Sequence, residues 1–250
     1  MKIDYPSQVH IPQLRSLWQE AFGDEDAFLD NFFSLGFSFD RCRCLTIDGQ
    51  VAAALYWFDC TCGQKTYAYL YAVATGLRFR GQGLCHRLME DTHAVLQQRG
   101  FAGAILVPAT DALFSLYAGM GYAPFGGMDC HTYTAQGAPA QMERLTASQY
   151  ARLRRQFLPD AGITQEGPML DFLSSWTQFY RGEDFLLAAA KDGDTLLAAE
   201  LLGNRNAAGS ILRALKLPQG HFRFPGAQPF AMGIAFDENA LPGYFGLALD

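Results

Sequence analysis

A glycine-rich turn at residues 78–83 is the part of this chain best suited to binding a ligand. It reads Arg-Phe-Arg-Gly-Gln-Gly and lies between an apolar stretch and an amphipathic one. The backbone N–H groups of such a turn converge on one spot, and the N-terminus of a following helix adds partial positive charge. Gly81 and Gly83 permit a positive φ and let a ligand approach the backbone closely. The segment therefore predicts a site for an anion, most naturally a phosphate.

Two common phosphate-binding fingerprints do not match this turn. The phosphate loop requires Lys and then Ser or Thr after its second glycine, whereas Gly83 is followed by Leu84 and Cys85. The dinucleotide pattern GxGxxG also fails, because His86 stands where the third glycine would be. The residues do match the pattern Arg-x-x-Gly-x-Gly, which begins at Arg78.

This pattern resembles the pyrophosphate-binding motif of the GNAT superfamily, the acyl-CoA-dependent N-acetyltransferases. Val73-Ala74-Thr75 stands where that family uses a splayed strand to hold pantetheine. Residues 116–122, Leu-Tyr-Ala-Gly-Met-Gly-Tyr, are similar to the family's Leu-Tyr-x-x-x-Gly-Phe/Tyr segment. The resemblance covers roughly residues 5–135. It implies acetyl-CoA as a cosubstrate, no metal, and an α/β fold in which helices flank a mixed sheet.

The resemblance also assigns roles to residues. Tyr117 is the expected general acid, which protonates the departing CoA sulfur. A phenol with an ordinary pKa near 10 is reasonably matched to a thiol with a pKa near 8.5. The backbone N–H of Val73 is the expected oxyanion donor, and Tyr122 is expected to be structural. Either arginine of the turn could contact phosphate or only solvate the loop. The residues expected to bind the cofactor are Val73, Ala74, Thr75, Arg78, Arg80, Gly81, Gln82, Gly83 and Leu84.

The general base has no clear candidate in the sequence. The strand before the loop carries Tyr67, Tyr69 and Tyr71 where many family members place a carboxylate. Their period-two spacing predicts that they share a face with Val73, where they either wall the acceptor site or pack in the core. A relay of water molecules could take the place of a general base, and an amine that arrives neutral would not need one.

Other ionisable residues are weaker candidates. His86 and His93 are expected at the surface rather than as bases. Asp250, at the end of an apolar tail, is considered because some multidomain aminoglycoside acetyltransferases of this superfamily bring a C-terminal carboxylate into the active site. The candidates for contact with the amine are Asp59, Glu20 and Glu25.

Composition sets broad limits on class and partners. Half of the 250 residues are hydrophobic, which indicates a globular protein with a substantial core. The net charge of −6 argues against nucleic acid as a partner and is compatible with an amine substrate. The sequence shows no secretory signal and no apolar run long enough for a membrane span, so we expect a cytoplasmic protein with no membrane partner. The CxC spacing of Cys42, Cys44, Cys60 and Cys62 is not that of common zinc sites, so buried, reduced cysteines are expected.

The resemblance implies that residues 1–137 form the catalytic domain, and hydrophobic periodicity predicts its helices and strands. A hairpin turn is expected at Asp48-Gly49. The expected helices are residues 8–22, 24–36, 84–98 and 111–119, and the expected strands are residues 41–47, 50–60, 66–73, 102–107 and 130–134.

Residues 138–250 are predicted to form a second, degenerate domain of the same architecture. Asp192-Gly193 lies 144 residues after Asp48-Gly49, and each follows two helical segments. The same offset places the counterpart of the glycine turn at residues 222–227, where Pro225 removes a needed N–H group. This half would then complete the substrate cleft or form a homodimer interface. An unrelated appendage is the alternative.

These features favour an N-acetyltransferase. It would move an acetyl group from acetyl-CoA to a primary amine of a small molecule or peptide, by direct attack in a ternary complex. A non-catalytic CoA-binding or regulatory module is the alternative, which the missing acidic base favours and Tyr117 disfavours. Transfer to a tRNA-linked acceptor would need a basic groove, of which an acidic chain gives little sign.

Overall fold

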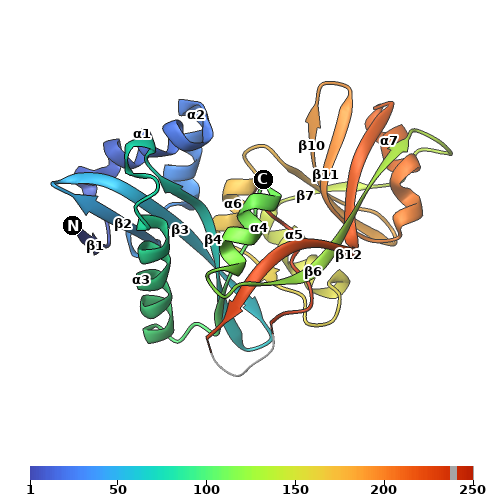
Figure 1. Cartoon of the computed structure of the whole chain (residues 1–250). Coiled ribbons are helices and arrows are strands. Elements are labelled where there is room, and N and C mark those ends of the chain that lie inside the picture. The colour runs from blue at the N-terminus through green and yellow to red at the C-terminus, as the bar shows by residue number, and fades with distance from the viewer. Residues whose placement is uncertain (237–240, 250) are drawn as a thin grey trace.

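The computed structural model describes residues 1–236 and 241–249, and their strands form one mixed sheet (Figure 1). Helices flank this sheet, which confirms the predicted α/β class. Along the sheet, the strands are β1 (Lys2–Asp4), β2 (Cys42–Ile47), β3 (Gln50–Cys62), β4 (Lys65–Thr75), β5 (Gly103–Leu106), β12 (Gln219–Ala235), β11 (Thr195–Gly203), β10 (Phe185–Asp192), β9 (Gln178–Arg181) and β7 (Glu143–Leu145). Two more strands lie off this path, β6 (Ala123–Thr134) beside β12 and β8 (Thr164–Gln165) beside β3.

The helices cover the sheet in layers. α1 (Ile11–Phe22), α2 (Asp26–Asn31), α5 (Ala147–Phe157) and α6 (Pro168–Leu173) bury their apolar faces in one core that spans both halves of the chain. α3 (Leu84–Gln98) and α4 (Asp111–Ala118) pack on the opposite face of the first half. α7 (Ala208–Leu215) packs on the second half. No helix of the described residues is long and apolar enough to cross a membrane.

Two long antiparallel strands join the halves. β6 and β12 pair from Gln219↔Thr134 to Gly233↔Ala123, and Figure 1 shows them running between the two lobes. The end of β12 also pairs with β5 of the first half, and its beginning lies parallel to β11 of the second. Gly137, where the sequence suggested a boundary, lies between β6 and β7, so the two halves share a sheet on either side of it.

The second half repeats the strand pattern of the first, but the elements that correspond between the two halves differ from the predicted ones. In each half, three antiparallel strands are followed by a helix and a parallel strand: β2–β3–β4, α3 and β5, then β9–β10–β11, α7 and β12. The hairpin at Asp192 therefore corresponds to the β3–β4 turn and not to the turn at Asp48. Residues 222–227 lie within β12, so their assignment as the counterpart of the glycine turn was wrong. The topological counterpart of the eight residues 76–83 is the four-residue segment 204–207.

A bulge near the end of β4 corrects a second prediction. Ala72 has a φ of +47° and adds one residue to β4 opposite β3. Tyr67, Tyr69 and Tyr71 consequently pack on the face covered by α1, whereas Val73 packs on the face covered by α3. The predicted shared face of the tyrosines and Val73 was therefore wrong, because the period-two alternation breaks at the bulge.

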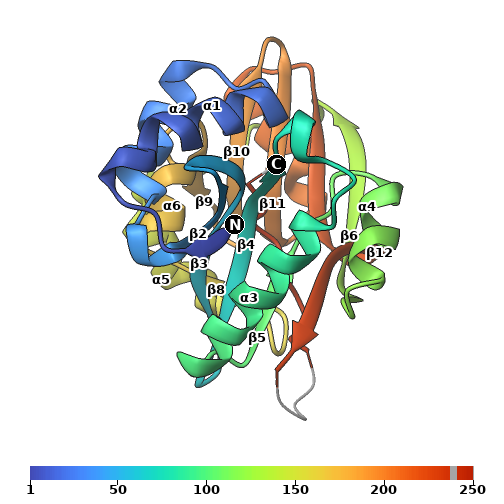
Figure 2. The same cartoon turned by 60° about the vertical axis from the view of Figure 1, so that its left-hand side comes forward.

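The strands β4 and β5 diverge just before this bulge. They are parallel and pair only from Tyr67↔Gly103 to Tyr69↔Ile105, while β4 continues to Thr75 along β3. Figure 2, turned by 60° from Figure 1, shows both strands with α3 in front of them. The divergence leaves room between the ends of the two strands, where the candidate site lies.

A buried ion pair fixes the C-terminal segment. Arg154 Nε and Glu200 Oε2 are 2.6 Å apart, and both side chains are excluded from solvent. Tyr150 and Tyr244 each donate a hydrogen bond of 2.9 Å to the same carboxylate. Because Tyr244 begins the apolar tail, this network holds the tail against the sheet.

The cysteines are free thiols. Cys42, Cys44 and Cys60 are buried as predicted, and burial raises the pKa of each. Cys130 is exposed, which the sequence did not indicate. Its position on β6 faces solvent rather than the core.

Candidate active site

The glycine turn has a backbone suited to an anion. Gly81 and Gly83 have φ values of +74° and +71°, which L side chains rarely adopt. A Cβ built on either glycine would meet no atom within 4 Å, so the space beside both is open. Helix α3 begins directly afterwards at Leu84, and its unpaired N-terminal N–H groups adjoin that space. The residues present therefore fit a pyrophosphate.

A groove of about 800 Å³ extends from this turn between β4, α3 and α4, and is called the loop groove below. Phe22, from the end of α1, closes part of its wall. Seven of the nine residues predicted to bind the cofactor line it: Val73, Ala74, Thr75, Arg80, Gly81, Gly83 and Leu84.

The two arginines of the turn have different surroundings. Arg80 lines the loop groove, and its Nε donates to the Thr75 carbonyl at 3.1 Å. Arg78 instead donates to Gln50, lies over the Phe79 ring and lines a separate groove beside α1. Gln82 donates to the Arg78 carbonyl at 3.4 Å. Of the two arginines, Arg80 is the one placed to meet a ligand in the loop groove.

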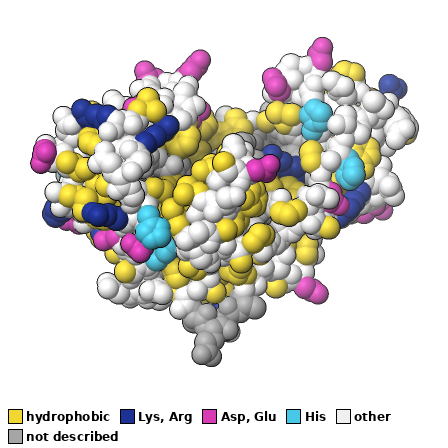
Figure 3. Space-filling view, viewed as in Figure 1, with side chains coloured by type: hydrophobic (Ala, Val, Ile, Leu, Met, Phe, Trp, Pro, Cys, Tyr) yellow, Lys and Arg dark blue, Asp and Glu magenta, His cyan; other side chains and the backbone are white. Residues whose placement is uncertain are grey.

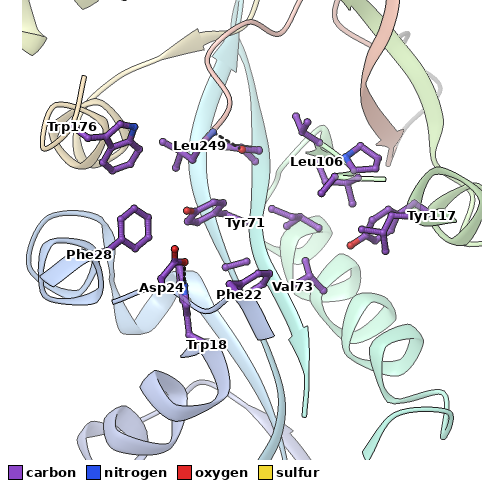
Figure 4. Close-up of a pocket in the computed structure, with 17 residues that line it drawn as sticks. Trp18, Phe22, Asp24, Phe28, Tyr71, Val73, Leu106, Tyr117, Trp176 and Leu249 are labelled. Atoms are coloured by element: carbon purple, nitrogen blue, oxygen red, sulfur yellow. Dashed lines mark hydrogen bonds between the residues drawn. The ribbon is translucent and has the colours of Figure 1, made fainter. Parts of the chain in front are cut away.

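A second cavity of about 420 Å³, called the aromatic cavity below, opens where β4 and β5 diverge. Figure 4 shows rings from several elements around it: Trp18 and Phe22 of α1, Phe28 of α2, Tyr71 of β4 and Trp176, which follows α6. Figure 3 shows hydrophobic side chains gathered in the hollow between the two lobes. Trp176 belongs to the second half of the chain, so both halves build this cavity.

The two spaces meet at four residues. Phe22, Val73, Leu113 and Tyr117 line both the loop groove and the aromatic cavity. Val73 is brought there by the β4 bulge and Tyr117 by α4, whose N-terminus is capped by the Thr110 hydroxyl. The loop groove and the aromatic cavity therefore adjoin each other at these side chains.

Tyr117 is a buried phenol that lines both the loop groove and the aromatic cavity. Its side chain is 7% exposed, and burial, together with the nearby Cys85, raises its pKa above the ordinary value. Its hydroxyl points toward Val73 in Figure 4. Among the described residues, no hydrogen bond is formed by that hydroxyl. The phenol therefore stays protonated at neutral pH and is free to bond a ligand.

Of the acidic candidates from the sequence, Glu20, Glu25 and Asp59 do not line the aromatic cavity. Glu20 accepts a hydrogen bond of 3.0 Å from the Leu77 N–H and so supports the loop. Asp59 lies 3.7 Å from Arg41, and Glu25 is an exposed residue at the start of α2. Asp250 lies outside the described residues. A different carboxylate lines this cavity.

That carboxylate is Asp24, which lines the aromatic cavity (Figure 4). Its Oδ2 accepts a hydrogen bond of 2.7 Å from Trp18 Nε1. In the sequence, Asp24 was only the first residue of the helix expected at residues 24–36, whereas α2 begins at Asp26 with Glu25 as its N-cap. The signal in the sequence that could have indicated this position is that Asp24 closely follows Trp18 and Phe22, the aromatic residues of α1.

The two histidines differ from each other. His86 pairs with Glu90 at 3.1 Å and lies at the rim of the loop groove. His93 is largely buried, with Nε2 2.7 Å from the Tyr122 hydroxyl, so its expected surface position was wrong. Tyr122 and Phe236, which belong to the core on the α3 side of the sheet, cover its ring.

Comparison with known proteins identifies the family. Residues 2–125 match the family model of the acetyltransferase (GNAT) domain. The N-terminal half of the chain is therefore a domain of the GNAT acetyltransferase family, as its motifs predicted. This membership places it among the acyltransferases that use CoA thioesters. No curated protein was found to match the chain by sequence.

Solved structures show that the fold extends beyond this domain. A GCN5-related N-acetyltransferase from Kribbella flavida superimposes with a TM-score of 0.73 at 15% identity, over 94% of this chain and 71% of that one. A GCN5-related N-acetyltransferase from Anabaena variabilis superimposes with a TM-score of 0.73 at 16% identity, over 94% of this chain and 73% of that one. At such identities the likeness shows the fold, and it includes the second half.

Proposed function

We propose that this protein transfers the acetyl group of acetyl-CoA to a primary amine of a small molecule or peptide. The observation that carries the proposal is the junction of the two spaces beside Val73 and Tyr117. A donor in the loop groove and an acceptor in the aromatic cavity would meet there. This arrangement supports direct attack within a ternary complex.

The donor would be held mainly by backbone groups. The N–H groups of the Gly81–Gly83 turn and of the start of α3 would bind the pyrophosphate, with Arg80 beside them. Ala74 and Thr75 would line the pantetheine arm. The bound thioester supplies the acyl group and the thiolate leaving group.

The chemistry then needs two contributions from the protein. The neutral amine attacks the thioester carbonyl carbon, and the Val73 N–H would stabilise the oxyanion that develops. The C–N bond forms and the C–S bond breaks, while Tyr117 donates its proton to the departing sulfur. The amine nitrogen loses its extra proton to water, and a proton returns from solvent to the Tyr117 phenolate. The reaction yields an amide and CoA, with one proton released for each ammonium consumed.

Calorimetric titration with acetyl-CoA tests the proposal. We expect micromolar binding by the wild-type protein and its loss in Gly83→Trp, because the indole fills the open space beside the turn. Gly193→Trp is the matched control, since Gly193 also has a positive φ and open space but lies in the β10–β11 turn. Absence of acetyl-CoA binding by the wild type would refute the proposal. Binding without turnover of any amine would favour the non-catalytic module.

A further inference from the structure

The charge of the aromatic cavity is concentrated in one residue. Seventeen described residues line this cavity, and Asp24 alone among them has a charged side chain. No Lys or Arg lies in that lining. Among the described side chains of the lining, one therefore offers a charge to a cation and none offers a charge to an anion.

Asp24 is fixed in place, and no described residue is its counter-ion. Its hydrogen bond from Trp18 holds one carboxylate oxygen, at 2.7 Å. No Lys or Arg in the described part of the chain forms an ion pair with it, although Asp26 and Asp30 nearby both pair with Arg15. Since Asp24 is half-buried, a ligand ammonium beside it would gain a charge-assisted hydrogen bond in a partly desolvated place.

The rings around Asp24 form a continuous wall. The Trp18 and Tyr71 centroids are 5.5 Å apart, those of Trp18 and Phe28 are 6.3 Å apart, and those of Phe28 and Trp176 are 5.4 Å apart. Phe22 stands at the mouth with 46% of its surface exposed. Rings at such tilted and edge-on angles suit a further aromatic ring, because aromatic pairs favour these geometries.

From this combination we infer that the acceptor is an arylalkyl monoamine, with its ammonium at Asp24 before deprotonation and its ring against Trp18, Phe28 and Trp176. The inference rests on the proposed function, since it names the substrate class of the same site. The volume of about 420 Å³ is within the range of small-molecule sites.

The same features disfavour the other small amines. A polyamine or an aminoglycoside carries several ammonium groups, and among the described lining residues those beyond the first would meet rings and aliphatic side chains and no second carboxylate. An aromatic amino acid would place its own carboxylate in the same lining, where Asp24 repels it and no cation compensates. One positive charge on an apolar body is the composition that the lining matches.

A substrate panel tests the inference. Acetylation with acetyl-CoA is measured for 2-phenylethylamine, spermidine, kanamycin and phenylalanine. We expect kcat/KM for 2-phenylethylamine to exceed that for each of the others by about tenfold or more. Calorimetric titration of 2-phenylethylamine into the protein saturated with CoA measures acceptor binding independently of turnover.

Variants separate the contribution of charge from that of structure. Asp24→Asn keeps an acceptor oxygen for Trp18 but loses the charge, so KM for 2-phenylethylamine should rise by about tenfold to a hundredfold, the usual range for a hydrogen bond to a charged group. Glu25→Gln, at the exposed neighbouring position, should leave KM unchanged. Trp176→Ala should raise KM with little change in acetyl-CoA binding.

The outcomes are distinct for the two proposals. Absence of acetyl-CoA binding by the wild-type protein would refute the proposed function. Intact acetyl-CoA binding with preferred acetylation of spermidine, kanamycin or phenylalanine would overturn the acceptor class alone. An unchanged KM in Asp24→Asn, or no binding of 2-phenylethylamine to the CoA-saturated protein, would also overturn it.

Discussion

Tyr117 on α4 and Val73 at the β4 bulge lie where the loop groove meets the aromatic cavity, and the Tyr117 hydroxyl points toward Val73 (Figure 4). The two residues are brought together by elements that are distant in the sequence. An oxyanion formed at the Val73 N–H would be next to a leaving group within reach of the phenol. Acid and oxyanion donor would then act on the two sides of one reacting carbon.

Replacing Tyr117 tests its proposed role as the general acid. In Tyr117→Phe we expect kcat to fall by about 10²-fold or more, the usual scale of general acid catalysis, with little change in acetyl-CoA affinity. Steady-state kinetics and calorimetry measure the two quantities. Tyr122→Phe is the control, because its ring centroid is 5.8 Å from that of Tyr117 but its hydroxyl bonds His93. An unchanged kcat in Tyr117→Phe would remove the residue from the mechanism.

The arginines of the glycine turn give a matched pair of variants. Arg80→Ala should weaken acetyl-CoA binding by about tenfold, since it removes a cation that lines the loop groove. Arg78→Ala should have little effect, because its guanidinium lies over Phe79 and bonds Gln50. Titration of both variants with acetyl-CoA measures the difference. Equal losses would mean that the turn rearranges on binding.

Local features of the site could be predicted from the sequence. The helix from Leu84 to Gln98 was assigned with the bounds that the structure has, and Gly81 and Gly83 have the positive φ values that the sequence predicted for the turn. Both depend on neighbouring residues, namely glycines that permit a positive φ and an apolar stripe with helical spacing. The family followed from the same short motifs.

The features that could not be predicted depend on contacts between distant segments. Ala72 takes a positive φ although nothing in its type suggests a bulge, so the side on which Val73 lies was missed. The pairing of β12 with β5 joins residues more than 120 positions apart. Asp24 and Trp176 become neighbours of one cavity only when both halves have folded. Such placements follow from tertiary packing, which overrides local pattern.

The buried ion pair is expected to be important for stability. Glu200→Gln leaves Arg154 buried without a full counter-charge, so the free energy of unfolding should fall by about 3–5 kcal/mol. Glu166→Gln removes the partner of Arg155 at an exposed site, and should cost about 1 kcal/mol or less. Urea unfolding monitored by circular dichroism compares the two. Similar losses in both variants would contradict a special role for the buried pair.

His93 should make stability depend on pH between neutrality and pH 5. Burial lowers its pKa to about 4, against an ordinary value of 6.5, while Glu90 opposes the shift and His86 adds to it. Because the folded pKa is below the unfolded one, the unfolded chain binds the proton more readily, and stability falls as the pH drops below 6.5. From pH 7 to pH 5 the expected loss is about 2 kcal/mol.

Urea unfolding at these two pH values measures this dependence, and His93→Gln should remove most of it while still offering Tyr122 a hydrogen bond. His86→Gln, at an exposed position of the same helix, should retain it. Carboxylates such as Asp4 and Asp40 have pKa values lowered below 3.8 and so titrate at lower pH. If His93→Gln lost as much stability as the wild type between pH 7 and pH 5, another group would be responsible for the pH dependence. The lowered pKa of His93 would then not explain it.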